Sequence, residues 1–286
     1  MDTRRDDSGW TIRFDPAEAE RLRAAGIWRG RTTAEDARRL AGERAHEVCV
    51  AEGGVEVSYA DALAQGERLA AALAEMGLGP GDVASFQIPN WHEAVAINLA
   101  ACLLGLVVNP IVSIYREHEV RTILADARAK VVFVPGTFRG FDYADMMARL
   151  TTDLPDLKAV VVVRGSPRPG QHAYADLLSA GAPEPAWPRI APEAVKMVLY
   201  TSGTTGRPKA VLHTHETIAR AFAVSADRWG IRPRDTVIMP SPIGHVTGYC
   251  YGLEMPFNQE TRSLLMERWD PDEAVRLIDR EGVRMT

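Results

Sequence analysis

A polar segment at residues 201–209 is the part of the chain whose residue types best suit chemistry. It follows residues 196–200, an apolar run that is typical of a buried strand. Glycines let backbone amides face an anion at close range, hydroxyl groups can donate to phosphate oxygens, and a lysine adds a compact positive charge. The sequence therefore predicts a loop that holds a polyphosphate through Thr201, Ser202, Gly203, Thr204, Thr205, Gly206 and Lys209.

Two other interpretations of this segment fit its residues less well. A flexible linker needs neither a strand before it nor a lysine after a proline. A Walker P-loop needs a second glycine where this chain has Pro208, and a serine or threonine where it has Ala210. Pro208 also lacks a backbone amide that such a loop would use. We therefore expect a phosphate-binding loop of another kind.

Short apolar strands alternate with helices along most of the chain, and these elements would position the loop. Strands are predicted at residues 48–51, 55–59, 83–88, 106–109, 131–134, 159–163, 196–200, 210–213, 236–239 and 262–266. Helices are predicted at residues 15–25, 33–45, 59–76, 91–104, 116–127, 141–150, 173–179, 215–228 and 270–280. Strands without polar alternation, separated by helices, indicate an α/β fold of layered, largely parallel sheets with helices on both faces.

A proline-rich stretch is expected to divide the chain. We predict a first α/β subdomain over residues 1–182, the connection over residues 183–192, and a second α/β subdomain that begins within residues 193–286 with the strand before the phosphate loop. Residues 281–285 are typical of a helix end followed by the beginning of a strand. We therefore expect the second subdomain to be truncated at Thr286.

The composition indicates a globular protein of a reducing compartment. The 286 residues are 46% hydrophobic, and the net charge of −5 gives no basic footprint for nucleic acid. Three widely spaced cysteines, Cys49, Cys102 and Cys250, do not suggest a disulfide framework. The N-terminus is acidic and has no apolar signal segment, and the most apolar stretch, residues 94–108, is too short to span a bilayer. We expect a cytoplasmic protein without a transmembrane segment.

Residues 200–210 resemble the nucleotide-binding signature of the AMP-dependent synthetase and ligase superfamily, the adenylate-forming enzymes. Ala210 stands where that family usually has glycine. Residues 73–89 and 240–248 are similar to further segments of the family, and residues 109–119 and 138–143 resemble cyclohexanecarboxylate-CoA ligase and related acyl-CoA ligases. The resemblance covers nearly the whole chain.

The resemblance implies that a carboxylic acid is activated with ATP to an acyl-adenylate and then transferred to CoA. It implies that the residues of the predicted polyphosphate loop cradle the ATP β- and γ-phosphates. Lys209 would aid the departure of pyrophosphate, and His245 would lie beside the acyl group as a second catalytic residue. ATP, Mg²⁺ and coenzyme A are the implied cofactors. No metal ligand is assigned, because the family's usual carboxylate is not found in the sequence.

The family's later motifs and its C-terminal domain are also not found, so the resemblance implies the N-terminal portion of a longer enzyme. A separate C-terminal half is then an expected partner, beside the small-molecule acid, ATP and CoA. Two alternatives remain open: an adenylating enzyme whose acceptor is a carrier-protein thiol, and a non-catalytic fragment that binds nucleotide. Trp229, Tyr249 and Tyr251 could line an acid pocket, although core packing is the commoner role of such residues.

Overall fold

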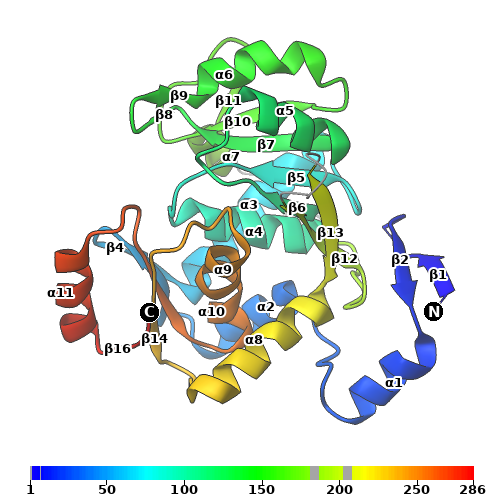
Figure 1. The fold of residues 1–286 in the computed structure, drawn as a ribbon, viewed down its shortest axis with the longest axis vertical. Coiled ribbons are helices and arrows are strands. Elements are labelled where there is room, and N and C mark those ends of the chain that lie inside the picture. The colour runs from blue at the N-terminus through cyan, green and yellow to red at the C-terminus, as the bar shows by residue number, and fades with distance from the viewer. Residues whose placement is uncertain (1, 7, 181–186, 202–207) are drawn as a thin grey trace.

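Two sheets of unequal size organise the computed structural model, which describes residues 2–6, 8–180, 187–201 and 208–286 (Figure 1). The larger sheet has seven strands, which run parallel except for the last pair. In spatial order these are β11 (His172–Ala173), β10 (Ala159–Val163), β7 (Ala129–Pro135), β5 (Val83–Phe86), β6 (Val107–Pro110), β12 (Val195–Thr201) and β13 (Lys209–Thr214).

The smaller sheet joins strands from opposite ends of the chain. In spatial order these are β16 (Val283–Met285), β14 (Thr236–Met239), β15 (Arg262–Leu265), β3 (Val48–Glu52) and β4 (Val55–Ser58). All neighbours are parallel except β3 and β4, which form the predicted hairpin. Two short antiparallel pairs lie outside the sheets, namely β1 (Asp2–Arg5) with β2 (Thr11–Phe14) and β8 (Thr137–Phe138) with β9 (Phe141–Asp142).

Helices connect most of these strands. They are α1 (Pro16–Ala24), α2 (Thr33–Glu43), α3 (Tyr59–Glu75), α4 (Glu93–Leu104), α5 (Glu117–Asp126), α6 (Tyr143–Leu150), α7 (Tyr174–Ser179), α8 (His215–Trp229), α9 (Val246–Gly248), α10 (Met255–Asn258) and α11 (Pro271–Glu281), with a 3₁₀ turn η1 (Thr151–Asp153) and a π-helix η2 (Tyr249–Glu254). Local signals set their ends: Thr32 and Glu35 form a capping box at α2, and Asp270 caps α11. In the part of the chain that the structure describes, no helix has the length and apolarity to cross a membrane.

Helices cover both faces of the seven-stranded sheet, with α5 and α6 on one side and α3 and α4 on the other (Figure 1). The cluster around α3 and α4 contains core residues of both sheets, including Phe86 of β5 and Val237 of β14. Every residue of α4 is buried, because this helix is apolar on nearly all sides. The predicted fold class is therefore confirmed.

Most of the predicted elements are present, with ends that differ by a few residues. The prediction missed the helical segment at residues 246–258 and the two short hairpins. It also placed Thr201 and Lys209 in a loop, whereas both are paired strand residues. The division at residues 183–192 stays a prediction, and each of the two larger sheets combines strands from both sides of it.

Candidate active site

Two residues of the predicted phosphate segment, Thr201 and Lys209, lie at the end of the β12–β13 ladder. Thr201 and Lys209 face each other as the last pair of the ladder, and the Thr201 hydroxyl donates to the Lys209 carbonyl oxygen at 3.4 Å. Both residues are exposed. The residues predicted between them, Ser202, Gly203, Thr204, Thr205 and Gly206, lie outside the described part of the chain. The last described pair of this ladder thus places a hydroxyl and an ammonium group on adjacent strands, on two exposed residues.

Buried polar side chains fix β12, the strand that ends with Thr201. Asn109 of β6 donates through Nδ2 to the Val198 carbonyl of β12 at 3.1 Å, and its Oδ1 accepts from Ser85 of β5 at 3.0 Å. β12 is parallel to β6 through Met197↔Val108, so the two strands end at the same edge of the sheet. Ligand sites of open α/β sheets lie at this carboxyl edge. The position of Thr201 therefore suits ligand binding.

A second segment of interest leads from β14 to His245. The buried side chain of Asn90 holds this segment: Nδ2 donates to the carbonyl oxygens of Met239 and Ser241 at 3.0 and 2.9 Å, and Oδ1 accepts from the Ile243 amide at 2.9 Å. His245 is exposed and precedes α9, where its Nδ1 accepts from the Thr247 amide at 3.4 Å. The segment is thus rigidly anchored, while the imidazole remains accessible.

The His245 segment approaches the same sheet edge as the β12–β13 hairpin. A Cβ atom at Gly244 would lie 2.3 Å from the carbonyl oxygen of Ile111, which directly follows β6. Because β6 is the neighbour of β12, both predicted catalytic residues lie on segments that reach the carboxyl edge of adjacent strands. Among the described residues, no hydrogen bond or ion pair joins His245 directly to Lys209 or Thr201.

This close approach gives a test of the backbone packing beside His245. Gly244→Ala is expected to lower the free energy of unfolding by about 1–3 kcal/mol, because the new methyl group would overlap the Ile111 carbonyl. Gly42→Ala is the matched control, since Gly42 lies in α2 with open space around it and should gain about 0.5–1 kcal/mol of helix stability. Urea unfolding measures both changes. Equal stability of Gly244→Ala and the parent would contradict the packing described here.

The three aromatic residues that could line an acid pocket differ in burial. Tyr249 is fully buried and stacks near Phe86, whereas Trp229 is 48% exposed and tilts against Tyr251 at a ring distance of 5.4 Å. Tyr249 therefore belongs to the core, and the contact of Trp229 with Tyr251 joins the end of α8 to η2.

A buried ion pair beneath this region was missed from the sequence. The sequence predicts Lys196 as the first residue of an apolar strand, yet its Nζ lies 2.7 Å from Oε1 of Glu254, with side chains 1% and 0% exposed. A charged residue inside each of two apolar runs is the signal that could have found the pair.

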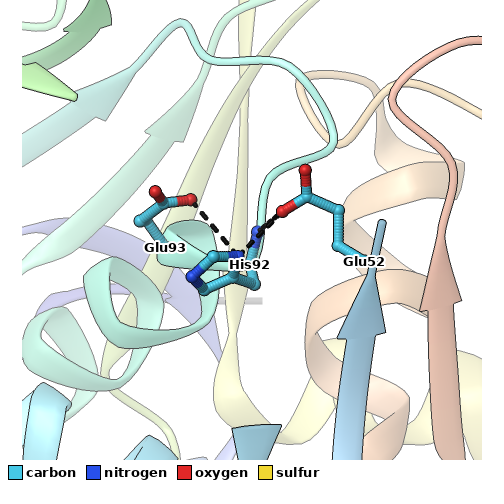
Figure 2. A group of neighbouring side chains, drawn as sticks. All are labelled: Glu52, His92 and Glu93. Carbon is cyan, nitrogen blue, oxygen red and sulfur yellow. Dashed lines mark hydrogen bonds and ion pairs between the residues drawn. The ribbon is translucent and has the colours of Figure 1, made fainter. Parts of the chain in front are cut away.

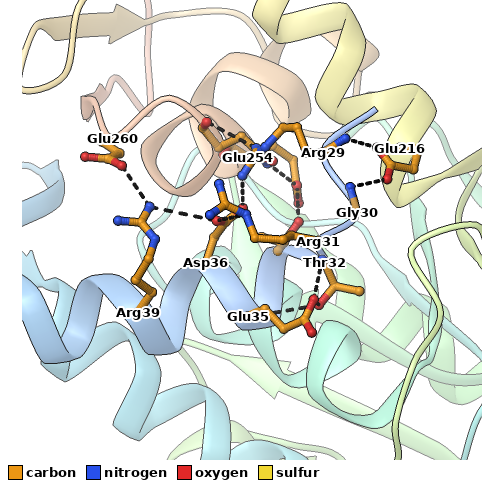
Figure 3. Close-up of polar contacts among 12 residues, drawn as sticks. Arg29, Gly30, Arg31, Thr32, Glu35, Asp36, Arg39, Glu216, Glu254 and Glu260 are labelled. Carbon is orange, nitrogen blue, oxygen red and sulfur yellow. Dashed lines mark hydrogen bonds and ion pairs between the residues drawn. The ribbon is translucent and has the colours of Figure 1, made fainter. Parts of the chain in front are cut away.

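A network around Asp36 positions α8, the helix that follows the hairpin (Figure 3). The guanidinium groups of Arg29, Arg31 and Arg39 surround the buried Asp36 carboxylate. The backbone amides of Arg29 and Gly30 donate to the carboxylate of Glu216, in the first turn of α8, at 2.9 and 2.7 Å. The segment before α2 therefore holds the beginning of α8, which in turn follows β13.

Glu52, His92 and Glu93 form the group of described residues whose donor atoms come closest to a metal-binding arrangement, all within 4.8 Å of one another (Figure 2). The guanidinium of Arg164 already bonds both carboxylates, at 2.5 Å to Glu52 Oε2 and 2.6 Å to Glu93 Oε1. It also stacks over Trp91 at 4.5 Å. A divalent cation would have to displace this arginine, so the donor set does not fit a magnesium site.

The Glu52 network predicts a contribution to acid stability. Burial alone would raise the pKa of Glu52, but hydrogen bonds from His92 and Arg164 outweigh it and lower the pKa to about 2. The folded pKa is below the unfolded value, so the stabilisation is present above about pH 4.5 and is lost as pH falls toward about 2. The free energy of unfolding, measured with urea, should fall between about pH 6 and about pH 3. In Glu52→Gln this fall should be smaller by on the order of 2–3 kcal/mol. Glu75→Gln, on the exposed end of α3, is the control, and an unchanged pH profile in Glu52→Gln would contradict the assignment.

Comparisons with known proteins show the family of the chain. The model of the AMP-binding enzyme family matches residues 35–286. The chain is 27% identical to the medium-chain fatty-acid–CoA ligase of Escherichia coli (strain K12), over 95% of this chain and 48% of the relative. It is 30% identical to the salicyl-AMP ligase / salicyl-S-ArCP synthetase of Mycobacterium tuberculosis (strain ATCC 25618 / H37Rv), over 97% of this chain and 50% of the relative.

A solved structure has a similar fold. The apo structure of Mycobacterium smegmatis MbtA superposes with a TM-score of 0.85 at 25% identity, covering 95% of this chain and 50% of that one. The chain spans about half the length of the curated relatives it matches. A family model that covers most of the chain and structures of the same fold lead to one conclusion: the chain belongs to the AMP-binding enzyme family.

Proposed function

We propose that this chain carries the nucleotide-binding part of an enzyme that activates a carboxylic acid with ATP and then transfers the acyl group to a thiol. The observation that carries the proposal is the pairing of Thr201 with Lys209 at the carboxyl edge of the sheet, within the segment that the family model matches. A hydroxyl and an ammonium on adjacent strands suit the oxygens of a polyphosphate. Ser202, Gly203, Thr204, Thr205 and Gly206 are assigned to the same site by their sequence.

The proposed first step is attack by a carboxylate oxygen on the α-phosphorus of ATP. A new P–O bond forms to the acid, the bond to the β-phosphate oxygen breaks, and pyrophosphate leaves. Lys209 would stabilise the negative charge on the departing group, since a fixed cation acts where charge develops. Magnesium would accompany ATP, and no described residue of this chain is assigned to it.

The proposed second step forms a thioester. The thiol of coenzyme A gives up its proton to solvent and its sulfur attacks the acyl carbon. The bond between that carbon and the phosphate oxygen breaks, and AMP leaves with that oxygen. His245 is assigned to the acyl side of the site, because its anchored segment approaches the same sheet edge as the hairpin. As an exposed imidazole it can contact the acyl group or its carboxylate.

A carrier-protein thiol is the second candidate acceptor. One relative carries the name salicyl-S-ArCP synthetase, which favours this alternative, whereas another is named as a CoA ligase. The two relatives also differ in acid, since one is named for salicylate and one for medium-chain fatty acids. We therefore propose a medium-chain, alicyclic or aromatic carboxylate as the substrate class.

Exchange of labelled pyrophosphate into ATP tests the proposal. The native gene product is incubated with ATP and with octanoate, cyclohexanecarboxylate or salicylate in turn. Exchange that depends on one of these acids supports the function. Binding of ATP without exchange with any of the acids would contradict it and leave a nucleotide-binding fragment. Addition of CoA or of a pantetheinylated carrier protein then identifies the acceptor by which thioester forms.

A further inference from the structure

The ion pair between Lys196 of β12 and Glu254 of η2 is among the most deeply buried polar features of the described residues. Both side chains are almost completely inaccessible, and Nζ lies 2.7 Å from Oε1. A lone charge at this depth would be strongly unfavourable. Each charge is therefore stabilised by the other, because β12 and η2 hold the two groups in direct contact.

Neighbouring side chains satisfy the remaining hydrogen bonds. The Lys196 ammonium also lies 2.9 Å from the Tyr249 hydroxyl and 3.1 Å from the Cys102 sulfur. Glu254 accepts from Asn98 Nδ2 at 2.6 Å through Oε1. Its Oε2 accepts from Thr33 at 2.8 Å and from Asn258 at 3.1 Å. The network joins β12 to α2, α4, η2 and α10.

The π-helical geometry of η2 contributes directly to this arrangement. In a π-helix the backbone hydrogen bonds join residue i to residue i+5. Side chains five residues apart therefore lie closer to the same side of the helix than they do in an α-helix. Tyr249 and Glu254 are the first and last residues of η2, and the Tyr249 hydroxyl lies 3.3 Å from Glu254 Oε1. Both side chains can therefore reach the same lysine.

Charge states follow from these contacts. Burial opposes ionisation of Glu254, but Lys196, Asn98 and Thr33 outweigh it and lower the pKa of this carboxyl group. Burial also opposes the charge on Lys196, and its neighbours, among them Cys102 and Glu254, raise the pKa of this amine. Both shifts favour the charged form of each group, as the 2.7 Å contact between Nζ and Oε1 does.

The pair joins the two segments to which the proposed function assigns the reaction. Lys196 lies on the strand that ends at Thr201, before the phosphate segment. Glu254 is the last residue of η2, within the helical segment that begins directly after His245. We propose that the Lys196–Glu254 pair is a positioning element that fixes the end of β12, where Thr201 pairs with Lys209, relative to the acyl side of the site. This inference rests on the proposed function.

An energetic argument supports a positioning role over a purely stabilising one. Replacing a buried ion pair by well-packed uncharged residues is often neutral or favourable for stability. A pair that contributes little net stability can still define one arrangement of the elements it joins. Because in-line attack is sensitive to displacements of about 1 Å, a small change of register between the two segments would slow the reaction.

The test compares the native gene product with the double variant Lys196→Met with Glu254→Gln. Methionine keeps the unbranched length of lysine, and glutamine keeps the shape of glutamate. We expect a melting temperature within a few degrees of the parent, KM values for ATP and for the acid within about twofold, and kcat for pyrophosphate exchange lowered about tenfold or more. Loss of kcat without loss of binding distinguishes misalignment from a damaged fold.

The control is Arg262→Met with Glu281→Gln, which removes an ion pair of 2.7 Å between β15 and α11, together with the contacts of Arg262 with Glu56 and of Glu281 with Arg280. It should leave kcat within about twofold of the parent. A second double variant, Lys196→Gln with Glu254→Gln, keeps hydrogen-bonding groups at both positions. It is used in place of the first variant when the first variant does not fold and the second does. Loss of folding in both variants would overturn the positioning role, because the pair would then be required for the fold itself.

Exchange by the parent is measured first. Its absence rejects the proposed function, whereas a parent with normal exchange and a folded double variant with unchanged kcat reject only the positioning role. A kcat loss that is equal in the Arg262/Glu281 control would also overturn it, because the effect would not be specific to the segments at the site.

Discussion

Lys209→Ala is expected to slow acid-dependent pyrophosphate exchange by about 10²–10³-fold, the cost of removing one charge-stabilising group from a reaction centre. Lys209 is exposed at the end of the β12–β13 ladder and pairs with Thr201 through the backbone. Its side chain therefore contributes little to packing, and the melting temperature should stay within a few degrees of the parent. Exchange kinetics and thermal unfolding of the same preparation measure the two quantities.

Lys158→Ala is the matched control for this experiment. Lys158 is a lysine outside the hairpin, and its ammonium donates to the Gly77 carbonyl at 2.7 Å. Exchange should be unchanged in this variant, because Lys158 lies next to β10, at the other side of the seven-stranded sheet. A folded Lys209→Ala variant with the parental exchange rate would remove Lys209 from the proposed mechanism.

Lys196→Met alone should destabilise the protein far more than the double variant does. The single change leaves the Glu254 carboxylate fully buried without its partner, and breaking a buried pair in this way costs about 3–5 kcal/mol. We expect the midpoint of urea unfolding to fall accordingly, with an unchanged m-value if the native fold persists. Adding Glu254→Gln removes the stranded charge and should restore most of the loss.

This stability comparison has its own contradicting result. If Lys196→Met is as stable as the parent, the ammonium group does not offset the cost of burying the Glu254 carboxylate. The buried contact is then not an ion pair in solution. If the second substitution restores nothing, the loss comes from packing of the lysine stem rather than from charge.

Elements of the fold could be predicted where local patterns decide them. The strand β10 and the wholly buried helix α4 appear in the sequence as runs of apolar residues. Asp270 marks the beginning of α11. The segment of α9, η2 and α10 was missed, because its apolar residues are interrupted by glycine, glutamate and proline and follow no α-helical period.

Long-range placement could not be read from the sequence. Nothing local indicates that β3 pairs with β15, or that Asn90 anchors the segment before His245. Asn98 interrupts the most apolar stretch of the sequence, but its contacts with Glu254 and Lys196 depend on how three elements meet in space. The phosphate-segment residues were identified as a motif, and their chemistry remains a prediction.

Transfer of oxygen from the acid to AMP tests the central claim most directly. The acid that supports exchange is labelled with ¹⁸O in its carboxylate and converted with ATP and CoA by the native gene product, and the AMP is analysed by mass spectrometry. Attack of the carboxylate on the α-phosphorus predicts one ¹⁸O atom in each AMP. Unlabelled AMP, or label in inorganic phosphate together with ADP, would contradict activation through an acyl-adenylate.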